Sequence, residues 1–432
     1  MKLVQSWGRL ESTLHQVVSL TSPQQAKIAI KEKSPGLAFG NGRSYGDICL
    51  NPNGFLWNTQ GLNNFCSWVP ETGRLTTEAG VLLKDVQQTF LSRGWMLPVT
   101  PGTQLVTVGG AIANDVHGKN HHAFGTFGDH IIRLWLLRTN GQEIECSRSI
   151  NSEWFEATIG GMGLTGVILK AEIQLRQVNG PWLESETIPF QGLENFFSLS
   201  DSSESEWEHT VSWIDCLAGI NTRGIFMRAN PSKYNKMKET ASGSRKIIFT
   251  PPISPVNQLT LSIFNSTYYW IQRARPGKSI VNYTNFFYPL DGILNWNRLY
   301  GPNGFYQYQS VIPRETGLDA TREMLKEISR AGEGSFLAVL KTFGKRPPCG
   351  LLSFARPGVT LALDFPNRNF KTLALFKRLD SIVEEAGGAL YLAKDNRMSR
   401  EMFFKTYPSL GKFLPFRDPG ITSSMSRRLF GS

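Results

Sequence analysis

The 432-residue sequence lacks the cysteine pattern of a disulfide-stabilised or zinc-binding protein. Its cysteines are odd in number, lie far apart and include no C-x-x-C pair: Cys49, Cys66, Cys146, Cys216 and Cys349. This distribution favours reduced thiols over a disulfide framework or a zinc ribbon.

Long hydrophobic runs are also missing. No stretch reaches the roughly 18 apolar residues of a membrane-spanning helix. The N-terminal sequence MKLVQSWGRLESTLHQVV has no apolar core of a signal peptide. We therefore expect a cytoplasmic protein or one held peripherally at the inner membrane.

Acidic residues are too few to balance the basic ones. The sequence has 46 Lys and Arg against 35 Asp and Glu, which gives a formal net charge of +11. Such an excess favours an anionic partner: a phosphorylated metabolite, nucleic acid or an anionic membrane. Because no block of five basic residues occurs between Lys2 and Arg428, we expect no nucleic-acid partner.

Two sets of catalytic signatures are absent, namely H-E-x-x-H and the protein-kinase set. One G-x-G-x-x-G does occur, at Gly161–Gly166. A dinucleotide site needs a strand before this motif and a helix after it. Here the pattern predicts the reverse order, which excludes a nicotinamide site and leaves only tight backbone turns.

What the sequence does have is a glycine-rich stretch at 101–130, PGTQLVTVGGAIANDVHGKNHHAFGTFGDH. It contains six glycines, four of the six histidines and few bulky aliphatic side chains after Ile112. Glycine permits positive φ and close approach of the backbone to a ligand, and exposed N–H groups suit a phosphate or a polar ring edge. The stretch therefore predicts a loop that lies against a bound cofactor.

The histidines of this stretch are poor candidates for a metal site. Gly118 disfavours a helix that would bring His117 and His121 together, no Cys or Glu lies in the loop, and Lys119 would repel a cation. We expect His121, His122 and His130 to bond to backbone or solvent, His117 to face a ligand, and no metal to bind.

Two further segments leave alternatives open. Gly40–Asp47, GNGRSYGD, is either an ordinary glycine-rich turn or a diphosphate cradle with backbone donors and an arginine. Lys394 follows the apolar run ALYLA. It is either a solvated turn lysine or a catalytic group at the end of a strand.

The pattern of elements predicts an α+β fold without regular βα alternation. We expect a first domain over 1–178, which includes a hairpin turning at Asn140-Gly141, and a second domain over 179–389 with an antiparallel sheet and flanking helices. Helices are predicted at 317–331 and 371–386. We also expect a flexible excursion over 230–255, suited to a lid, and a loosely held tail after Arg417.

Six segments, taken together, resemble flavin-dependent oxidoreductases of the vanillyl-alcohol-oxidase type and, more closely, the decaprenylphosphoryl-β-D-ribose 2′-oxidase family. They occur in the family's order over nearly the whole chain: GNGRSYGD, PGTQLVTVGGAIANDVHGKNHH, GGMGLTGVI, FYQYQSVIP, LDFP and YLAKDNR. The resemblance implies a two-subdomain FAD-binding domain of the PCMH type, and a C-terminal segment, 390–432, that returns to it.

The resemblance also implies which residues hold FAD. The 40–47 loop would wrap the diphosphate, and 102–114 with His117 would line the flavin and its ribityl chain. The implied set is Gly40, Asn41, Gly42, Arg43, Ser44, Tyr45, Gly102, Thr103, Gly109, Gly110, Ala113, Asn114, His117, Gly118, Gly163, Thr165, Gly166, Ile168 and Tyr391. Relatives with covalent flavin carry histidine near Arg43, so its absence implies non-covalent FAD.

For catalysis the resemblance implies that Lys394 lies at the flavin and the substrate, where a cation stabilises charge at flavin N1 and C2=O. The proton acceptor for the alcohol is either His117 or neutral Lys394. The implied substrate residues are Lys119, which would meet a phosphate, with Trp213, Gln307, Tyr308, Gln309, Asp364 and Lys394. Ala362 replaces the cysteine of mycobacterial members, so thiol-directed inhibitors should not bond here.

The implied function is oxidation of the 2′-hydroxyl of a polyprenyl-phosphate ribofuranose to a ketone. A separate NAD(P)H-dependent keto-reductase would then give the arabinofuranose epimer for arabinan or cell-envelope biosynthesis. One alternative is an FAD-dependent oxidase of a free alditol, aldonolactone or other sugar alcohol. Another is a non-enzymatic binder of an anionic polymer or membrane.

Overall fold

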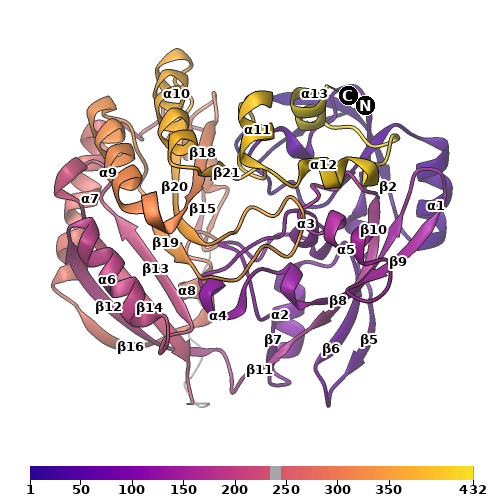
Figure 1. The fold of residues 1–432 in the computed structure, drawn as a ribbon, viewed down its shortest axis with the longest axis horizontal. Helices are drawn as coiled ribbons and strands as arrows, with labels where there is room; N and C mark the ends of the chain where they lie inside the picture. The colour runs from indigo at the N-terminus through magenta and orange to yellow at the C-terminus, as the bar shows by residue number, and fades with distance from the viewer. Residues whose placement is uncertain (234–244, 432) are drawn as a thin grey trace.

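Three β-sheets of four or more strands carry the fold in the computed structural model, which describes residues 1–233 and 245–431. Two of them belong to the N-terminal part of the chain, and the largest belongs to the middle part. Figure 1 shows the N-terminal part on the right and the large sheet with its helices on the left. The predicted α+β class is confirmed.

The first sheet has the strand order β1-β2-β4-β3. Strands β2 and β3 run parallel to β4, while β1 pairs with β2 in antiparallel fashion. Helix α1 connects β2 to β3, and Ser22 caps its first turn by accepting a bond from the Gln25 N–H. The elements are β1 (Lys2–Gln5), β2 (Ser12–Ser19), α1 (Pro23–Glu32), β3 (Gly36–Phe39) and β4 (Phe55–Asn58).

The second sheet is antiparallel, with the order β5-β6-β10-β8-β9. The predicted hairpin at Asn140-Gly141 is confirmed, since it joins β8 to β9. The strands are β5 (Phe65–Val69), β6 (Arg74–Glu78), β8 (Ile131–Leu137), β9 (Glu143–Ser147) and β10 (Val167–Gln174), and the helices near them are α2 (Leu83–Leu91), α3 (Val108–Ala113), α4 (His121–Phe124) and α5 (Ser152–Thr158). Helix α5 precedes the G-x-G-x-x-G turn and β10 follows it, the order that the sequence predicted.

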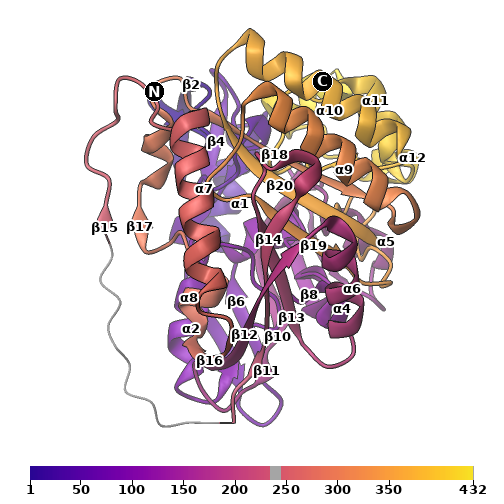
Figure 2. The same ribbon diagram turned by 90° about the vertical axis from the view of Figure 1, so that its left-hand side faces the viewer.

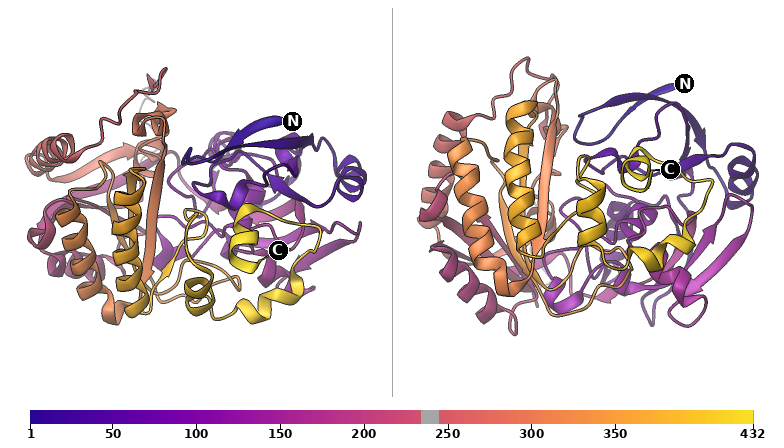
Figure 3. Two further views of the ribbon diagram at one scale, coloured as in Figure 1. Left: turned by 90° about the horizontal axis from the view of Figure 1, so that it is seen from above. Right: turned by 45° about the horizontal axis from the view of Figure 1, so that its top comes forward.

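The third sheet is antiparallel, with the order β16-β12-β14-β13-β19-β20-β18-β21. Its strands are β12 (Trp182–Gln191), β13 (His209–Ile214), β14 (Arg223–Pro231), β16 (Gly277–Asn282), β18 (Phe305–Ile312), β19 (Val339–Phe343), β20 (Gly358–Pro366) and β21 (Ala389–Leu390). Seen from above, helices cover its outer face, away from the N-terminal part (Figure 3). These are α6 (Leu193–Ser203), α9 (Arg314–Ala331) and α10 (Phe370–Glu385), so the helices predicted at 317–331 and 371–386 are confirmed.

Helix α7 (Gln258–Arg273) lies on the inner side of this sheet. Its Tyr269 packs with Trp213 and Ile225, whereas Phe226 on the next position of β14 packs with Phe196 of α6. Figure 2 shows α7 at the front, with α8 (Tyr283–Phe287) below it. Two further sheets have two short strands each: β7 (Trp95–Met96) pairs with β11 (Arg176–Gln177), and β15 (Arg245–Lys246) pairs with β17 (Ile293–Leu294).

The prediction of a loosely held tail is wrong. Helices α11 (Arg400–Thr406), α12 (Leu410–Phe413) and α13 (Ser424–Phe430) pack on the N-terminal part (Figure 1). Ser423 and Ser426 form a capping box at α13, and Met425 and Leu429 are fully buried. Their i, i+4 spacing gives this short helix one apolar face. The predicted excursion at 230–255 lies partly outside the described residues, at 234–244.

Candidate active site

A cavity of about 840 Å³ lies between the N-terminal part and the inner face of the large sheet. Ligand-binding cavities usually span about 300 to 1,000 Å³, so this one has room for a large cofactor and part of a substrate. The wall runs from the 40–49 loop and residues 100–119, across β13 and β19, to α7.

Nearly all the residues predicted to bind a cofactor line this cavity. They are Gly40, Asn41, Gly42, Arg43, Ser44, Tyr45, Gly102, Thr103, Gly109, Gly110, Ala113, Asn114, His117, Gly118, Gly163, Gly166, Ile168 and Tyr391. Thr165 does not: its side chain is fully buried behind the wall, and its hydroxyl lies 2.9 Å from that of Thr158. Thr165 is thus the one predicted cofactor residue that does not line the cavity.

Two glycines of the 40–46 loop are dictated by close contacts. A Cβ atom at Gly40 would collide with the hydroxyl of Thr107, and one at Gly46 would collide with the carbonyl oxygen of Asp395. The backbone N–H of Tyr45 also donates to the carbonyl of Ala393, at 3.1 Å. The loop therefore packs directly against the turn that carries Lys394.

Of the residues predicted to contact substrate, five line the cavity: Lys119, Trp213, Gln307, Gln309 and Lys394. Tyr308 does not, because successive side chains on a strand point to opposite faces of the sheet. Its ring packs on Phe376 of α10 and its hydroxyl donates to Asp380. Asp364 is buried beneath Gln307, whose Nε2 donates to Asp364 Oδ1 at 2.7 Å. Neither prediction of direct lining holds.

His117 is a buried, neutral imidazole. Burial lowers its pKa well below the usual value, and Lys341, His121 and Lys394 lower it further. Gln309 Nε2 lies 3.1 Å from His117 Nε2. Since an amide nitrogen only donates, the ring proton is on Nδ1, and this N–H has no protein partner among the described residues.

Three partly buried lysines line the cavity with His117. Burial lowers the pKa of Lys119 and of Lys341 to about 7 in each case, and neighbouring lysines add to the effect at Lys341. Burial also lowers the pKa of Lys394, while the charge of Asp364 raises it. Each lysine can thus gain or lose a proton near neutral pH, which suits acid–base chemistry.

Contacts fix the position of each ammonium group. Lys394 Nζ lies 3.7 Å from the centre of the Tyr45 ring. Lys341 Nζ donates to the carbonyl of Gly118 at 2.7 Å, and Lys119 donates to the carbonyl of Phe286. Lys341 was missed by the sequence reasoning, although a lone lysine inside the apolar strand FLAVLKTF was a usable signal.

The other loop histidines have structural roles, as predicted. His121 Nδ1 accepts the Gly344 N–H at 3.2 Å, and ring nitrogens of His122 and His130 bond to the carbonyls of Trp207 and Phe124 at 2.7 and 2.8 Å. In the part of the chain that the structure describes, no group of three His, Cys, Asp or Glu side chains could hold a metal ion.

Comparison with known proteins identifies the family and its cofactor. An FAD binding domain family model matches residues 16–147. The decaprenylphosphoryl-β-D-ribose oxidase of Mycolicibacterium smegmatis is 34% identical over 99% of this chain and 97% of its own length. This chain belongs to the decaprenylphosphoryl-β-D-ribose oxidase family. It is therefore an FAD-dependent oxidoreductase whose FAD-binding domain is of the PCMH type.

Two other relatives match less of the chain. An uncharacterized protein in the mprA 5′ region of Streptomyces coelicolor is 30% identical over 81% of this chain and all of its own length. The L-gulonolactone oxidase of Mus musculus is 29% identical over 37% of this chain and 34% of its own length.

The cavity has the chemistry that FAD requires. Among the residues that the structure describes, four polar atoms of the cavity wall are buried without a protein partner: Arg43 Nε, Asn114 Oδ1, His117 Nδ1 and Ser212 Oγ. Buried polar groups in native proteins are almost always paired. The flavin edge and the diphosphate of FAD offer both donors and acceptors, so these residues fit the cofactor.

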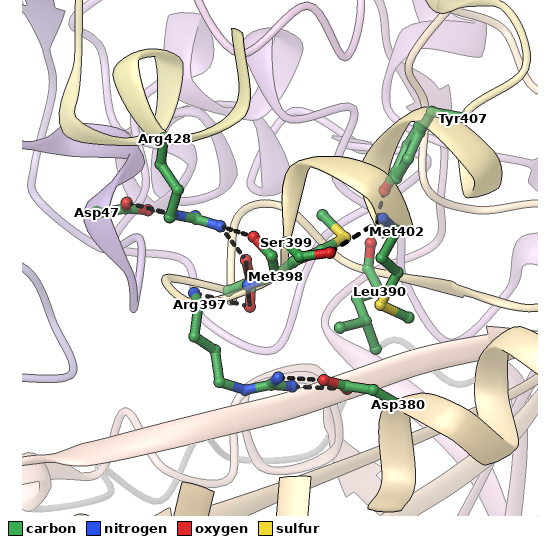
Figure 4. Close-up of polar contacts among 10 residues, drawn as sticks. Asp47, Asp380, Leu390, Arg397, Met398, Ser399, Met402, Tyr407 and Arg428 are labelled. Carbon is green, nitrogen blue, oxygen red and sulfur yellow. Dashed lines mark hydrogen bonds and ion pairs between the residues drawn. The ribbon is translucent and has the colours of Figure 1, made fainter. Parts of the chain in front are cut away.

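An ion-pair network holds the turn that carries Lys394 against the 40–47 loop (Figure 4). Arg428 of α13 donates to both carboxylate oxygens of Asp47, at 2.9 and 3.0 Å, and to Asp395 at 3.1 Å. Arg397, on the same turn, pairs with Asp380 of α10. The C-terminal helix thus fixes the residue after Lys394 to the end of the 40–47 loop.

Proposed function

We propose that this oxidoreductase converts the 2′-hydroxyl of a polyprenyl-phosphate ribofuranose to the 2′-ketone, the first half of an epimerisation to arabinofuranose. A separate NAD(P)H-dependent keto-reductase completes the epimerisation. The observation that carries the proposal is the similarity to decaprenylphosphoryl-β-D-ribose oxidase over 99% of the chain. The L-gulonolactone oxidase match covers only 37% of it, which gives weaker support to a free lactone or alditol.

The composition of the cavity supports an amphipathic, anionic substrate. Lys119 and Lys341 provide cations for a phosphate. Towards α7 the wall becomes apolar and aromatic, with Trp213, Phe264, Tyr268, Phe336 and Leu337. Contact of a prenyl chain with such a surface is favourable, because apolar groups are removed from water.

Oxidation of a secondary alcohol requires a hydride acceptor and a proton acceptor. FAD, when bound, supplies the hydride acceptor. We assign the proton to Lys394 Nζ, because burial favours its neutral form, which has a free lone pair. His117 is unsuited to this role, since Gln309 occupies Nε2 and the proton already resides on Nδ1. His117 instead donates its free N–H to the bound ligand.

Proton transfer also creates a positive charge on Lys394, beside the bound flavin and substrate. Lys394 becomes an ammonium ion as it takes the hydroxyl proton, and the low-dielectric cavity strengthens its attraction for negative charge on the bound ring. Gln307 and Gln309, held by Asp364 and Thr360, present amides on the same wall. They orient the sugar hydroxyls.

FAD is held without a covalent bond, because Arg43 stands where covalent relatives carry histidine. Arg43 stacks 4.2 Å above the Trp7 ring, which leaves a cation beside the diphosphate loop. Acid precipitation should therefore release all the flavin into the supernatant. Flavin that stays with the precipitated protein would contradict this.

Anaerobic flavin reduction tests the function. A polyprenyl-phosphoryl ribose should bleach the flavin, and borohydride treatment of the product should give both ribose and arabinose epimers. The 2′-deoxy analogue, which keeps the lipid and the phosphate, should leave the flavin oxidised. Bleaching by free alditols or lactones, with none by the lipid-linked ribose, would refute the proposal.

A further inference from the structure

Helix α7 exposes an apolar stripe to solvent. Leu259, Ile263 and Trp270 are 70%, 59% and 55% exposed. Their spacings of four and seven residues place them on one face of the helix. The face against the sheet carries buried Leu261 and Tyr269. Figure 2 shows no other element in front of α7.

The segment leading into α7 also exposes apolar side chains. Ile248, Phe249 and Ile253 are all more than two-thirds exposed. Arg298 donates to the carbonyl of Ile248 at 2.5 Å and thereby fixes the segment's backbone. Exposed apolar side chains in such numbers are typical of an interaction site.

Charge identifies the partner. Residues 245–290 contain no Asp or Glu, and their basic residues are Arg245, Lys246, Arg273, Arg275 and Lys278. Cations beside an apolar helical face suit the headgroups and acyl boundary of an anionic bilayer. A second copy of this chain would bring like charges together, which opposes self-association through this face.

The next face of α7 lines the active-site cavity. Phe264, Tyr268 and Gln272 belong to its wall, together with Arg275 just after the helix. Phe264 is also 40% exposed and follows Ile263 of the apolar stripe directly, so the cavity wall and the stripe adjoin on this helix. Aromatic contacts then continue inward, with Tyr268 and Trp213 ring centres 4.7 Å apart.

We propose that α7, with the apolar segment before it and the cations after it, is a docking surface for anionic phospholipid bilayers. It places the cavity opening at the lipid surface, so that a prenyl chain passes from the bilayer into the aromatic end of the cavity. The passage of the prenyl chain into the cavity rests on the proposed function. The binding of α7 to anionic vesicles does not.

Vesicle sedimentation with the FAD-loaded protein tests the surface. The wild type should bind phosphatidylcholine vesicles that contain phosphatidylglycerol and should be released by salt. The triple variant Leu259→Ser, Ile263→Ser, Trp270→Ser should bind at least about tenfold more weakly, because three apolar side chains no longer enter the lipid. Arg273→Gln and Lys278→Gln should each weaken binding about fivefold.

The matched control is Phe370→Ser, which removes an 85% exposed aromatic ring at the start of α10. It should bind vesicles as the wild type does. All of these side chains lie outside the cavity wall, so flavin content should stay unchanged. Equal binding by the triple variant, or no binding by the wild type, overturns the proposal. A concentration-dependent dimer that the triple variant abolishes, without vesicle binding, would overturn it in favour of a second copy.

A detergent-soluble, short-chain polyprenyl-phosphoryl ribose separates the two proposals. The triple variant should oxidise it at the wild-type rate and should lose activity only on substrate embedded in vesicles. Reduction by the short-chain substrate without vesicle binding refutes the docking surface alone. Vesicle binding without reduction by any lipid-linked ribose refutes the proposed function alone.

Discussion

The pair formed by Lys394 and Asp364 gives the sharpest test of the catalytic assignment. Asp364 is buried and Lys394 is partly buried on the cavity wall. Asp364 is the carboxylate whose charge raises the pKa of Lys394 against the effect of burial. The substitution Asp364→Asn removes this charge and keeps an oxygen that can accept the bond from Gln307 Nε2. The pKa of Lys394 should therefore fall further.

The size of the shift in the Lys394 pKa follows from the strength of its interaction with Asp364. A neighbouring opposite charge shifts a pKa by about 1 to 3 units, and burial partly neutralises Asp364 by raising its own pKa. We therefore expect a shift near the lower end, about one unit, or about 1.4 kcal/mol. Because the neutral form of Lys394 takes the proton, activity is lost as pH falls through its pKa. The acid limb of the pH–rate profile for flavin reduction should therefore move to lower pH.

Anaerobic stopped-flow reduction of the flavin, measured across the acid and neutral range, reports this limb directly. Asp291→Asn is the control, because Asp291 also lines the cavity but interacts with Arg43 and the Gln104 N–H. It should leave the acid limb in place. A limb that stays put in Asp364→Asn, or moves to higher pH, would show that deprotonation of Lys394 does not limit the reaction.

Three further substitutions probe the site. Lys394→Ala should slow flavin reduction about 10²- to 10⁴-fold with FAD still bound, and Lys394→Arg should be equally slow because a guanidinium keeps its proton. Arg428→Ala leaves Asp47 and Asp395 buried without their cation. It should lower the free energy of unfolding by about 3 kcal/mol, as measured by denaturant titration. It should also speed FAD release, as measured by flavin fluorescence. Ala362→Cys places a thiol on the cavity wall and should make residue 362 reactive towards a thiol-directed electrophile, as read by peptide mass spectrometry.

Each of these has a contradicting outcome. Unchanged reduction in Lys394→Ala would remove this residue from catalysis. Arg314→Ala breaks an exposed pair with Asp201 and should lower the free energy of unfolding by only about 0.2 to 1 kcal/mol. An equally small loss in Arg428→Ala would refute the stabilising role of the Arg428 ion pairs. An unlabelled residue 362 in Ala362→Cys would contradict its predicted reactivity. The wild type is the control: burial raises the pKa of the Cys49 thiol to about 12, so Cys49 should stay unlabelled.

Some features of the fold can be predicted from short stretches of sequence. The Asn140-Gly141 turn, the helices at 314–331 and 370–385 and the tight glycine turn before β10 all follow from local backbone preferences and hydrophobic periodicity. The six motif segments add the FAD chemistry, and all but one of the predicted cofactor residues line a single cavity.

Other features depend on which face of an element becomes covered. The alternation in FYQYQS separates Gln307 and Gln309 from Tyr306 and Tyr308, but either face was compatible with the sequence. Packing of α10 against the tyrosines decided that the glutamines face the cavity. The last helix was misjudged for the same reason, since Leu429 gains its burial only from segments that are distant along the chain.

The sequence by itself determined the glycine turns, the main helices and the membership in a flavin-dependent family, because these depend on residues close together or on motifs in a fixed order. Only the tertiary structure decided the protonation chemistry. It brought Lys119, Lys341 and Lys394 from three distant segments into one buried cavity, where desolvation lowers their pKa values. It also placed the free N–H of His117 and the apolar stripe of α7, since burial and exposure arise from the packing of the whole chain.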